Sequence, residues 1–295
     1  MRALIIAFSM YSKIPMPQIA WEEKALSRAL CFFPLVGAAA GLLLLGWMRL
    51  SAALGFGAVL SAAVAAAIPI ALSGGIHLDG FCDTCDALAS RQDRARKLEI
   101  MKDSHAGAFA VLGCGLYLLL LAAAWHEAAW SGRAGLALAL SPVPSRSLSG
   151  LFAALLPNAR GGGLLWAFTA PMDVRRTRLV LGLWIAACGA AMLGLDPWTG
   201  GFALLGAGVA GLYYVSMARR QFGGITGDLA GFFLQLLHLP AGSLQIQSRC
   251  QLGQLGAQGT ELLLIGVIFN DRHMDSPFQL NSSPILYYAT GDRQL

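Results

Sequence analysis

Three closely spaced aspartates are the side chains of this sequence best suited to hold a metal ion. Asp79 and Asp83 are four residues apart, and Asp86 follows three residues later. On a helix these spacings place all three carboxylates on one face, where they repel one another. A bound cation removes that repulsion, and hard divalent ions such as Mg²⁺ prefer carboxylate and phosphate oxygens. The spacing therefore predicts a Mg²⁺ site for chemistry on phosphoryl groups, with Asp79 and Asp83 among its catalytic side chains.

A second acidic pair, Glu99 and Asp103, repeats the four-residue spacing. On a helix these two carboxylates also share one face, so they are predicted to contribute further metal ligands. The chain between the two acidic segments is basic, with cationic side chains at Arg91, Arg94, Arg96, Lys97 and Lys102. Cationic side chains form strong hydrogen bonds to phosphate groups. We expect Arg91 and Lys102 to bind anionic groups of the substrate.

Zinc binding and redox chemistry are alternative interpretations of the first acidic segment. Cys82 and Cys85 form a C-x-x-C pair, and His77 and His105 lie nearby in the sequence. A structural zinc site usually has four ligands, and the sequence has no second cysteine pair. A thioredoxin-like role requires a βαβ context, which the sequence lacks. His77 is a candidate general base beside the metal, with a purely structural histidine as the alternative.

A second polar constellation lies at 219–228 and is rich in glycine. Gly223, Gly224 and Gly227 let backbone N–H groups approach a ligand closely, as phosphate-binding loops do, and Thr226 and Asp228 add polar side chains. A helix-capping turn with Asp228 as the N-cap explains the same residues nearly as well. Arg146 lies within an apolar stretch, where an arginine needs a partner. A carboxylate of the site or a substrate phosphate would supply that partner.

The elements that position these residues are predicted to be helices in a membrane. Hydrophobic residues make up 56% of the 295 residues and charged residues only 13%, whereas soluble domains carry about 25% charged residues. Six segments have the roughly 20 mostly apolar residues that a span requires: 31–49, 54–73, 107–125, 135–156, 179–195 and 200–218. Abundant Gly and Ala allow close helix packing in lipid. The fold class is therefore an all-α, polytopic integral membrane protein.

Loop charges predict the orientation of these six spans. Lys and Arg gather before the first span and after the second, fourth and sixth, while the intervening loops are poor in them. By the positive-inside rule the acidic active-site loop, 74–106, is expected to face the cytoplasm. The net charge of +5 is explained by this topology, and no aromatic residues interleave with the cations, which argues against nucleic-acid binding.

The two ends of the chain differ in character. Residues 1–238 are predicted to form the membrane-embedded domain, and residues 239–295 a weakly ordered polar tail. The apolar run 262–269 within that tail is too short to span a bilayer. The sequence is compatible with a homo-oligomer.

Several motifs resemble the cobalamin synthase family, also called adenosylcobinamide-GDP ribazoletransferases. The segments that carry the resemblance are 12–17, 33–37, 74–86, 98–104, 157–160 and 223–228, together with Arg146. The long Gly-Gly-Ile-His-Leu-Asp-Gly-x-x-Asp-x-x-Asp motif at 74–86 is the most specific of them. The chain departs from the family at Gln235, where many members carry glutamate, and in the polar end that replaces a last apolar span.

The resemblance implies a Mg²⁺-dependent membrane enzyme of vitamin B12 assembly. Such an enzyme joins adenosylcobinamide-GDP to α-ribazole, or to α-ribazole 5′-phosphate, and releases GMP. The resulting hypothesis has metal ligands at Asp79, Asp83, Asp86, Glu99 and Asp103. Substrate would be held by Arg91, Lys102, Arg146, Gly223, Gly224, Thr226 and Asp228, with Asp79, Asp83 and His77 catalytic.

Two other functions fit the same residues less closely. One is a membrane phosphotransferase of the CDP-alcohol type, whose Asp-x-x-Asp-Gly-x-x-Ala-Arg signature is matched only in part by Asp83, Asp86 and Arg91. The other is a transporter with the aspartates as a cation site. Transporter sites lie near the bilayer midplane, whereas these carboxylates precede an arginine-rich segment.

Overall fold

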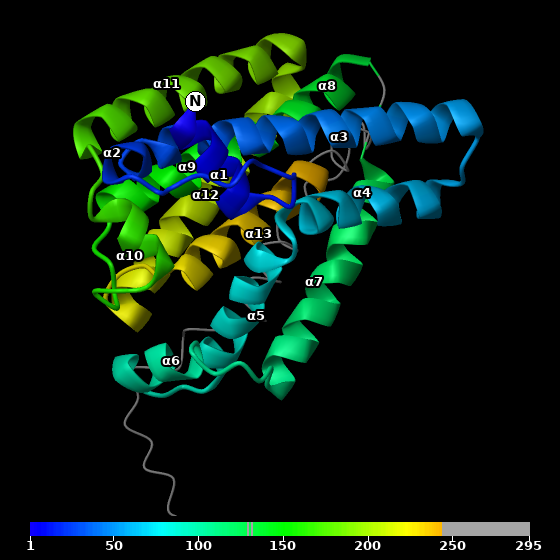
Figure 1. Cartoon of the computed structure of the whole chain (residues 1–295). Helices are drawn as coiled ribbons and strands as arrows, with labels where there is room; N and C mark the ends of the chain where they lie inside the picture. The colour runs from blue at the N-terminus through cyan, green and yellow to red at the C-terminus, as the bar shows by residue number, and fades with distance from the viewer. Residues whose placement is uncertain (129, 131, 244–295) are drawn as a thin grey trace, which may run out of the picture. The chain divides into compact units, whose positions relative to one another are not determined.

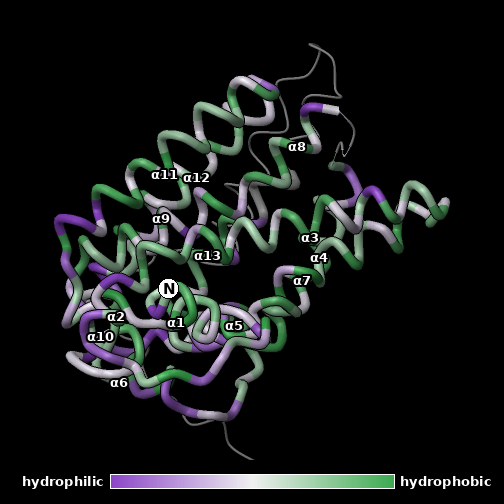
Figure 2. Tube along the Cα trace, turned by 45° about the horizontal axis from the view of Figure 1, so that its top comes forward, coloured by the Kyte–Doolittle hydropathy of each residue, from purple (hydrophilic) through white to green (hydrophobic). Residues whose placement is uncertain are grey.

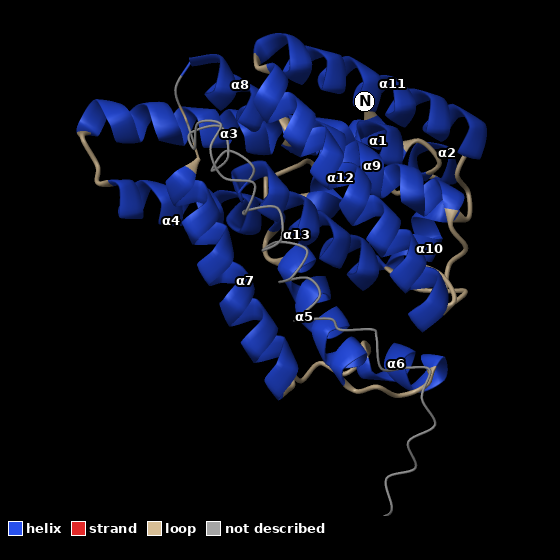
Figure 3. Ribbon diagram, turned by 180° about the vertical axis from the view of Figure 1, so that it is seen from behind, coloured by secondary structure: helices blue, strands red, loops and turns tan. Residues whose placement is uncertain are grey.

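The computed structural model describes residues 1–128, 130 and 132–243, which all belong to one compact unit. These residues form helices and loops, with no strand, as Figure 3 shows from behind the view of Figure 1. The helices are α1 (Arg2–Tyr11), α2 (Glu23–Leu26), η1 (Ala29–Phe32), α3 (Phe33–Leu54), α4 (Ala58–Ser73), α5 (Ile76–Ala89), α6 (Arg94–Ile100), α7 (Ala108–Glu127), α8 (Gly132–Leu140), α9 (Pro142–Leu155), α10 (Leu164–Thr169), α11 (Val174–Leu195), α12 (Pro197–Met217), η2 (Ala218–Phe222) and α13 (Gly227–Ser243).

Four helical segments of the described chain are long and apolar enough to cross a membrane. They are 29–54, 108–127, 174–195 and 197–222, and a bent pair formed by α4 and α5 brings the number to five if it counts as one span. Leucines on these segments stay largely exposed, Leu119 by 72% and Leu212 by 76%, as expected of side chains that face lipid. The predicted all-α, polytopic membrane protein is confirmed.

The number of spans differs from the six expected, for local reasons. The predicted span 135–156 is divided between α8 and α9, because Pro142 begins a new helix and cannot donate the hydrogen bond that would continue the first. In the predicted span 54–73, Leu54 ends α3 and only the 16 residues of α4 continue as helix. The predicted boundary at 238 falls inside α13, and residues 244–295 of the predicted tail lie outside the described residues.

A sharp bend between α4 and α5 sets the direction of the acidic helix. The two helices meet at 94°, and Gly74 and Gly75 between them have φ of +64° and +84°. This left-handed conformation costs glycine little and other residues much more. A β-carbon on Gly74 would also lie 2.1 Å from the Lys13 side chain. The segment predicted as an active-site loop is therefore largely helix α5, which leaves the line of α4 (Figure 1).

Helix α5 packs mainly against α13 and α7, and α9 lies among α3, α11 and α13. The crossing of α5 and α13 is a close one. A β-carbon on Gly80 would lie 2.6 Å from the Asp228 carbonyl oxygen, so only glycine lets the two backbones approach this far. Phe81 stacks on Phe232 across the same interface, with ring centroids 5.4 Å apart. Figure 2 shows that α2, α6 and α10 lie together at one end of this unit, where hydrophilic stretches of the chain gather.

Candidate active site

Helix α5 carries the three predicted aspartates, and they have different partners. Asp86 accepts hydrogen bonds from the backbone N–H of Gly107, at 2.6 Å, and of Ala110, at 2.8 Å. These N–H groups belong to the first turn of α7, which has no earlier helical carbonyls to bond. Asp86 therefore caps α7 from a neighbouring helix, and both of its oxygens are engaged.

Asp79 and Asp83 keep their carboxylates unengaged in the described part of the chain, where neither accepts a hydrogen bond nor forms an ion pair. Asp83 lies within electrostatic reach of Asp79 and Asp86 on its own helix, and of Asp228 and Arg160 from other segments. The two carboxylates that remain free thus lie on the face of α5 that meets the start of α13. This is the centre of the candidate site.

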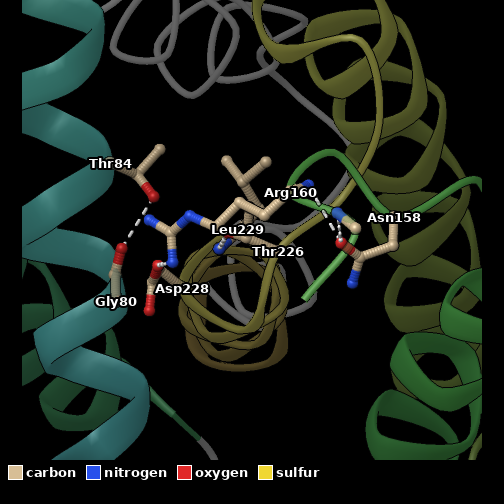
Figure 4. Close-up of polar contacts among 8 residues, drawn as sticks. Gly80, Thr84, Asn158, Arg160, Thr226, Asp228 and Leu229 are labelled. Atoms are coloured by element: carbon tan, nitrogen blue, oxygen red, sulfur yellow. Dashed lines mark hydrogen bonds and ion pairs between the residues drawn. The ribbon is translucent and has the colours of Figure 1, made fainter. Parts of the chain in front are cut away.

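An ion pair joins Asp228 to an arginine that is not among the site residues predicted from the sequence. Arg160 Nη1 lies 3.0 Å from Asp228 Oδ2, with side-chain exposures of 20% and 27%. Figure 4 shows the Arg160 guanidinium between Asp228 and the α5 residues Gly80 and Thr84. Burial raises the pKa of Asp228, and the charge of Arg160 opposes that shift. The sequence offered one signal for Arg160, because it lies in the segment 157–160, which is one of those that carry the family resemblance.

The backbone around Arg160 is fixed by an isolated parallel bridge between Asn158 and Ile225. Ile225 N donates to the Pro157 carbonyl and Ala159 N donates to the Ile225 carbonyl, both at 2.8 Å. The Asn158 side-chain oxygen accepts from Arg160 N and from the next amide, each at 2.9 Å (Figure 4). These bonds tie the segment after α9 to the loop before α13, and so direct Arg160 at Asp228.

Arg160 still has hydrogen-bonding capacity to spare. Its Nε and Nη2 atoms are buried and have no hydrogen-bond partner among the described residues. A buried N–H without a partner costs about 1–3 kcal/mol, and more when charged. These donors lie beside the free carboxylates, so they are suited to bind the oxygens of a phosphate.

The glycine-rich segment acts in the structure as a capping turn that packs against 157–159. Thr226 Oγ1 accepts from Leu229 N at 3.2 Å, so Thr226 caps α13, where the sequence suggested Asp228. Gly224 N donates to the Ala218 carbonyl, and a β-carbon on Gly224 would lie 2.3 Å from the Pro157 carbonyl oxygen. Gly223 has φ of +76° and faces the Arg94 side chain. The segment thus positions Asp228 and Arg160.

The other predicted acidic ligands lie on an exposed segment and have cationic or histidine partners. Glu99 Oε2 pairs with Arg96 Nη1 at 2.8 Å, and Asp103 Oδ1 lies 2.8 Å from His105 Nδ1. Hydrogen bonds from the His105 backbone and side chain lower the pKa of Asp103. Within the described ranges, no three His, Cys, Asp or Glu side chains are grouped closely enough to hold a metal ion between them. The structure therefore does not bring all five predicted metal ligands together. The described residues do not form a zinc site either.

Arg91 and Lys102, predicted to bind substrate, are both exposed and flank α6. Arg91 has a positive φ of 51°, which is uncommon outside glycine and ends α5 sharply. Helix α6 between them is docked on η2, because Arg94 Nε donates to the Arg220 carbonyl at 3.0 Å and Lys97 Nζ donates to Gln221 Oε1.

Arg146 has other partners than the site carboxylate that the sequence suggested. Its side chain is 2% exposed, and Nη1 lies 3.0 Å from His238 Nε2 and 3.2 Å from Ser145 Oγ. Because arginine only donates, His238 Nε2 accepts, which leaves Nδ1–H to donate to Gln235 Oε1 at 3.2 Å. Tyr117 OH donates to the same oxygen at 2.6 Å. This buried series of hydrogen bonds links α7, α9 and α13. Arg146 therefore belongs to the interior of the bundle.

His77, the candidate base, is buried to 7% exposure at the start of α5. The Gly231 backbone packs against it, and its ring centroid lies 6.3 Å from that of Phe33. This packing is typical of the structural alternative considered for His77.

Comparisons with known proteins point to one family. A family model described as cobalamin-5-phosphate synthase matches residues 3–241. An adenosylcobinamide-GDP ribazoletransferase of Lachnoclostridium phytofermentans is 39% identical over 242 residues, which are 82% of this chain and 92% of that protein. Its namesake in Pseudomonas savastanoi is 40% identical over 220 residues, or 74% and 87% of the two chains. Another, in Clostridium botulinum, is 30% identical over 233 residues, or 79% and 92%. No solved structure matches.

Proposed function

Because this chain belongs to the cobalamin-5-phosphate synthase family, we propose that the Asp79, Asp83, Arg160 and Asp228 cluster is its active site. The chain is an adenosylcobinamide-GDP ribazoletransferase of cobalamin biosynthesis. Its substrates are adenosylcobinamide-GDP and a ribazole, α-ribazole or its 5′-phosphate. The observation that carries the site is the pair of free carboxylates on α5 beside an arginine with unused donors.

The reaction is a displacement at phosphorus. A ribose hydroxyl of the ribazole attacks the phosphorus that bears adenosylcobinamide. The new P–O bond forms as the bond to the GMP oxygen breaks, and GMP leaves. The hydroxyl proton passes to a carboxylate oxygen of Asp83 that does not bind the metal. Arg160 binds a phosphate oxygen through Nε and Nη2, and Asp228 keeps its guanidinium in position.

The donor set suits Mg²⁺ in kind. Mg²⁺ is usually held by one or two carboxylates together with substrate phosphates, not by an all-protein cage. Asp79 and Asp83 supply two free carboxylates, while Asp86, Glu99 and Asp103 are engaged elsewhere. When bound, Mg²⁺ would neutralise charge on the pyrophosphate and on the leaving GMP. Asp79 and Asp83 are therefore its proposed protein ligands.

We propose that this site lies at the cytoplasmic face of a bacterial inner membrane. The segments around the site, including those with Arg160, Arg175 and Arg219, are rich in cations. Such segments are typically retained on the cytoplasmic side. Arg91 and Lys102 are the proposed contacts for the nucleotide part of the substrate, on the exposed segment next to the site.

The test is GMP release from adenosylcobinamide-GDP and α-ribazole in membranes that contain the full chain. We expect release to require Mg²⁺. Asp79→Asn and Asp83→Asn should lower kcat/KM by at least about 10²-fold, because each removes a charged ligand of the reacting groups. Glu99→Gln removes one charge from an exposed pair and serves as the matched control, with activity close to that of the parent chain. Equal losses in all three variants would refute the assignment of the site to α5.

A further inference from the structure

A cavity of about 500 Å³ lies apart from the proposed active site. It is bounded by the N-terminal segment, comprising α1, α2 and η1, by the start of α3 and by one face of α11. None of the side chains proposed for catalysis lines it. Nothing in the transferase reaction described above accounts for this cavity.

The polar wall of the cavity is cationic. Lys24, Arg28 and Arg176 line it, and none of them pairs with a carboxylate in the described part of the chain. The one acidic residue in the lining, Glu22, is already paired with Arg2. Three cations that converge without a counter-ion repel one another, and a bound anion relieves that repulsion. The wall therefore favours a negatively charged occupant.

The remaining wall is apolar and runs along a membrane-spanning helix. Arg176, Val180 and Trp184 follow one another at four-residue intervals on α11, so they share one face. At a rise of 1.5 Å per residue, Trp184 lies about 12 Å further along the span than Arg176. Phe32 at the end of η1 and Leu35 in the first turn of α3 line the cavity from another span, 29–54. The cavity thus extends from a charged end into the part of the span that faces hydrocarbon.

We propose that this cavity binds one anionic phospholipid of the surrounding bilayer. The headgroup phosphate lies among Lys24, Arg28 and Arg176, and an acyl chain follows Val180 and Trp184. Basic pockets beside membrane-spanning helices bind anionic headgroups in this way. A free phosphate would satisfy the cations but leave the apolar wall unfilled, whereas a phospholipid complements both. The lipid connects the N-terminal segment to α11, since Arg28 and Arg176 come from those two parts.

The position of Trp184 in the lining allows a direct test in nanodiscs that contain the whole chain. The probes are phosphatidylglycerol and phosphatidylcholine with brominated acyl chains, each titrated into unbrominated phosphatidylcholine. Bromine quenches tryptophan on contact, and the difference between the parent chain and Trp184→Phe isolates the Trp184 signal. We expect brominated phosphatidylglycerol to quench that signal at a lower mole fraction than brominated phosphatidylcholine does.

Three double variants, each made in both the Trp184 and the Trp184→Phe backgrounds, make the test specific. Arg28→Gln with Arg176→Gln should shift the phosphatidylglycerol titration by about fivefold for each charge removed, to the level of phosphatidylcholine. Arg49→Gln with Arg133→Gln removes the same charge outside the cavity and should leave the titration unchanged. Arg28→Lys with Arg176→Lys should retain the preference. GMP release in pure phosphatidylcholine, equal to that of the parent chain, shows that each variant is folded.

Two results would overturn the proposal. Equal quenching of Trp184 by both brominated lipids would mean that the cavity does not select the anionic headgroup. Abolition of the preference by excess inorganic phosphate would identify a site for small anions and not for a phospholipid.

Discussion

Replacing Arg160 with lysine separates the two roles proposed for its guanidinium, which are pairing with Asp228 and binding a phosphate. Lysine keeps the positive charge, so it can still pair with Asp228, whose carboxylate lies 3.0 Å from Arg160 Nη1. Lysine lacks the planar fork, however, and cannot replace Nε and Nη2. These two atoms are buried and have no partner in the described part of the chain. We therefore expect Arg160→Lys to fold normally and to bind the phosphate poorly.

The expected loss follows from the hydrogen bonds. Each hydrogen bond to a charged group contributes about 1.5–3 kcal/mol. Two such bonds to phosphate, reduced for a side chain that is 20% exposed, amount to about 2–4 kcal/mol. That free energy corresponds to a decrease of about 30-fold to 10³-fold in kcat/KM. Arg160→Ala should lose stability as well, because it leaves Asp228 buried without its cation.

The assay is GMP release in membranes, with thermal unfolding of the purified chain measured in parallel. Arg175→Lys, on an exposed arginine of α11, is the matched control and should leave kcat/KM unchanged. If Arg160→Lys retains kcat/KM within about threefold of the parent chain, the unused donors do not bind substrate, and the proposed role of Arg160 is incorrect.

Three further substitutions test other parts of the structure. Asp86→Ala should lower the free energy of unfolding by about 1–2 kcal/mol, because it uncaps α7, and should leave the Mg²⁺ concentration for half-maximal activity unchanged. If the Mg²⁺ concentration for half-maximal activity of Asp86→Ala rose tenfold, Asp86 would instead be a metal ligand. Gly80→Ala should destabilise the chain by about 1–3 kcal/mol and lower kcat, since its methyl group would collide with α13, whereas Gly115→Ala, with open space around it, should be neutral in both assays. Arg146→Ala should lower the thermal unfolding midpoint while KM for adenosylcobinamide-GDP stays constant, and a rise in KM without loss of stability would contradict its burial.

Helical periodicity predicted those features of the site that depend on residues close together in the sequence. The spacing of Asp79, Asp83 and Asp86 placed them on one helical face, and α5 has that geometry. Which of them are free depends on contacts distant in the sequence, because Asp86 bonds an amide 21 residues away. The Arg160 and Asp228 pair is more distant still, and no local pattern indicates it. The sequence identified the acidic residues of the proposed site, but not which of them are free and which one caps a helix.

The count of membrane spans shows a related limit. An apolar window of about 20 residues signals a span regardless of whether one helix fills it. Pro142 divides one such window into α8 and α9, and Gly74 and Gly75 end another at a bend. Arg146, which composition marks as an anomaly in an apolar stretch, finds its partner in His238, 92 residues later. Composition thus predicts the membrane environment well, while helix breaks and buried polar pairs depend on the tertiary fold.

The bend after α4 offers a way for a membrane protein to bring the carboxylates of the proposed site toward a phosphate-bearing substrate in water. Carboxylates inside a straight span would be costly in hydrocarbon and remote from water. The 94° bend takes α5 out of the line of α4, so that its aspartates meet the start of α13 instead of continuing through the bilayer. Backbone contact at Gly80 then fixes this meeting on two packed helices, which hold catalytic groups more firmly than a loop would. The glycines at 74, 75 and 80 thereby position the proposed site, although none of them contacts the substrate in the proposed mechanism.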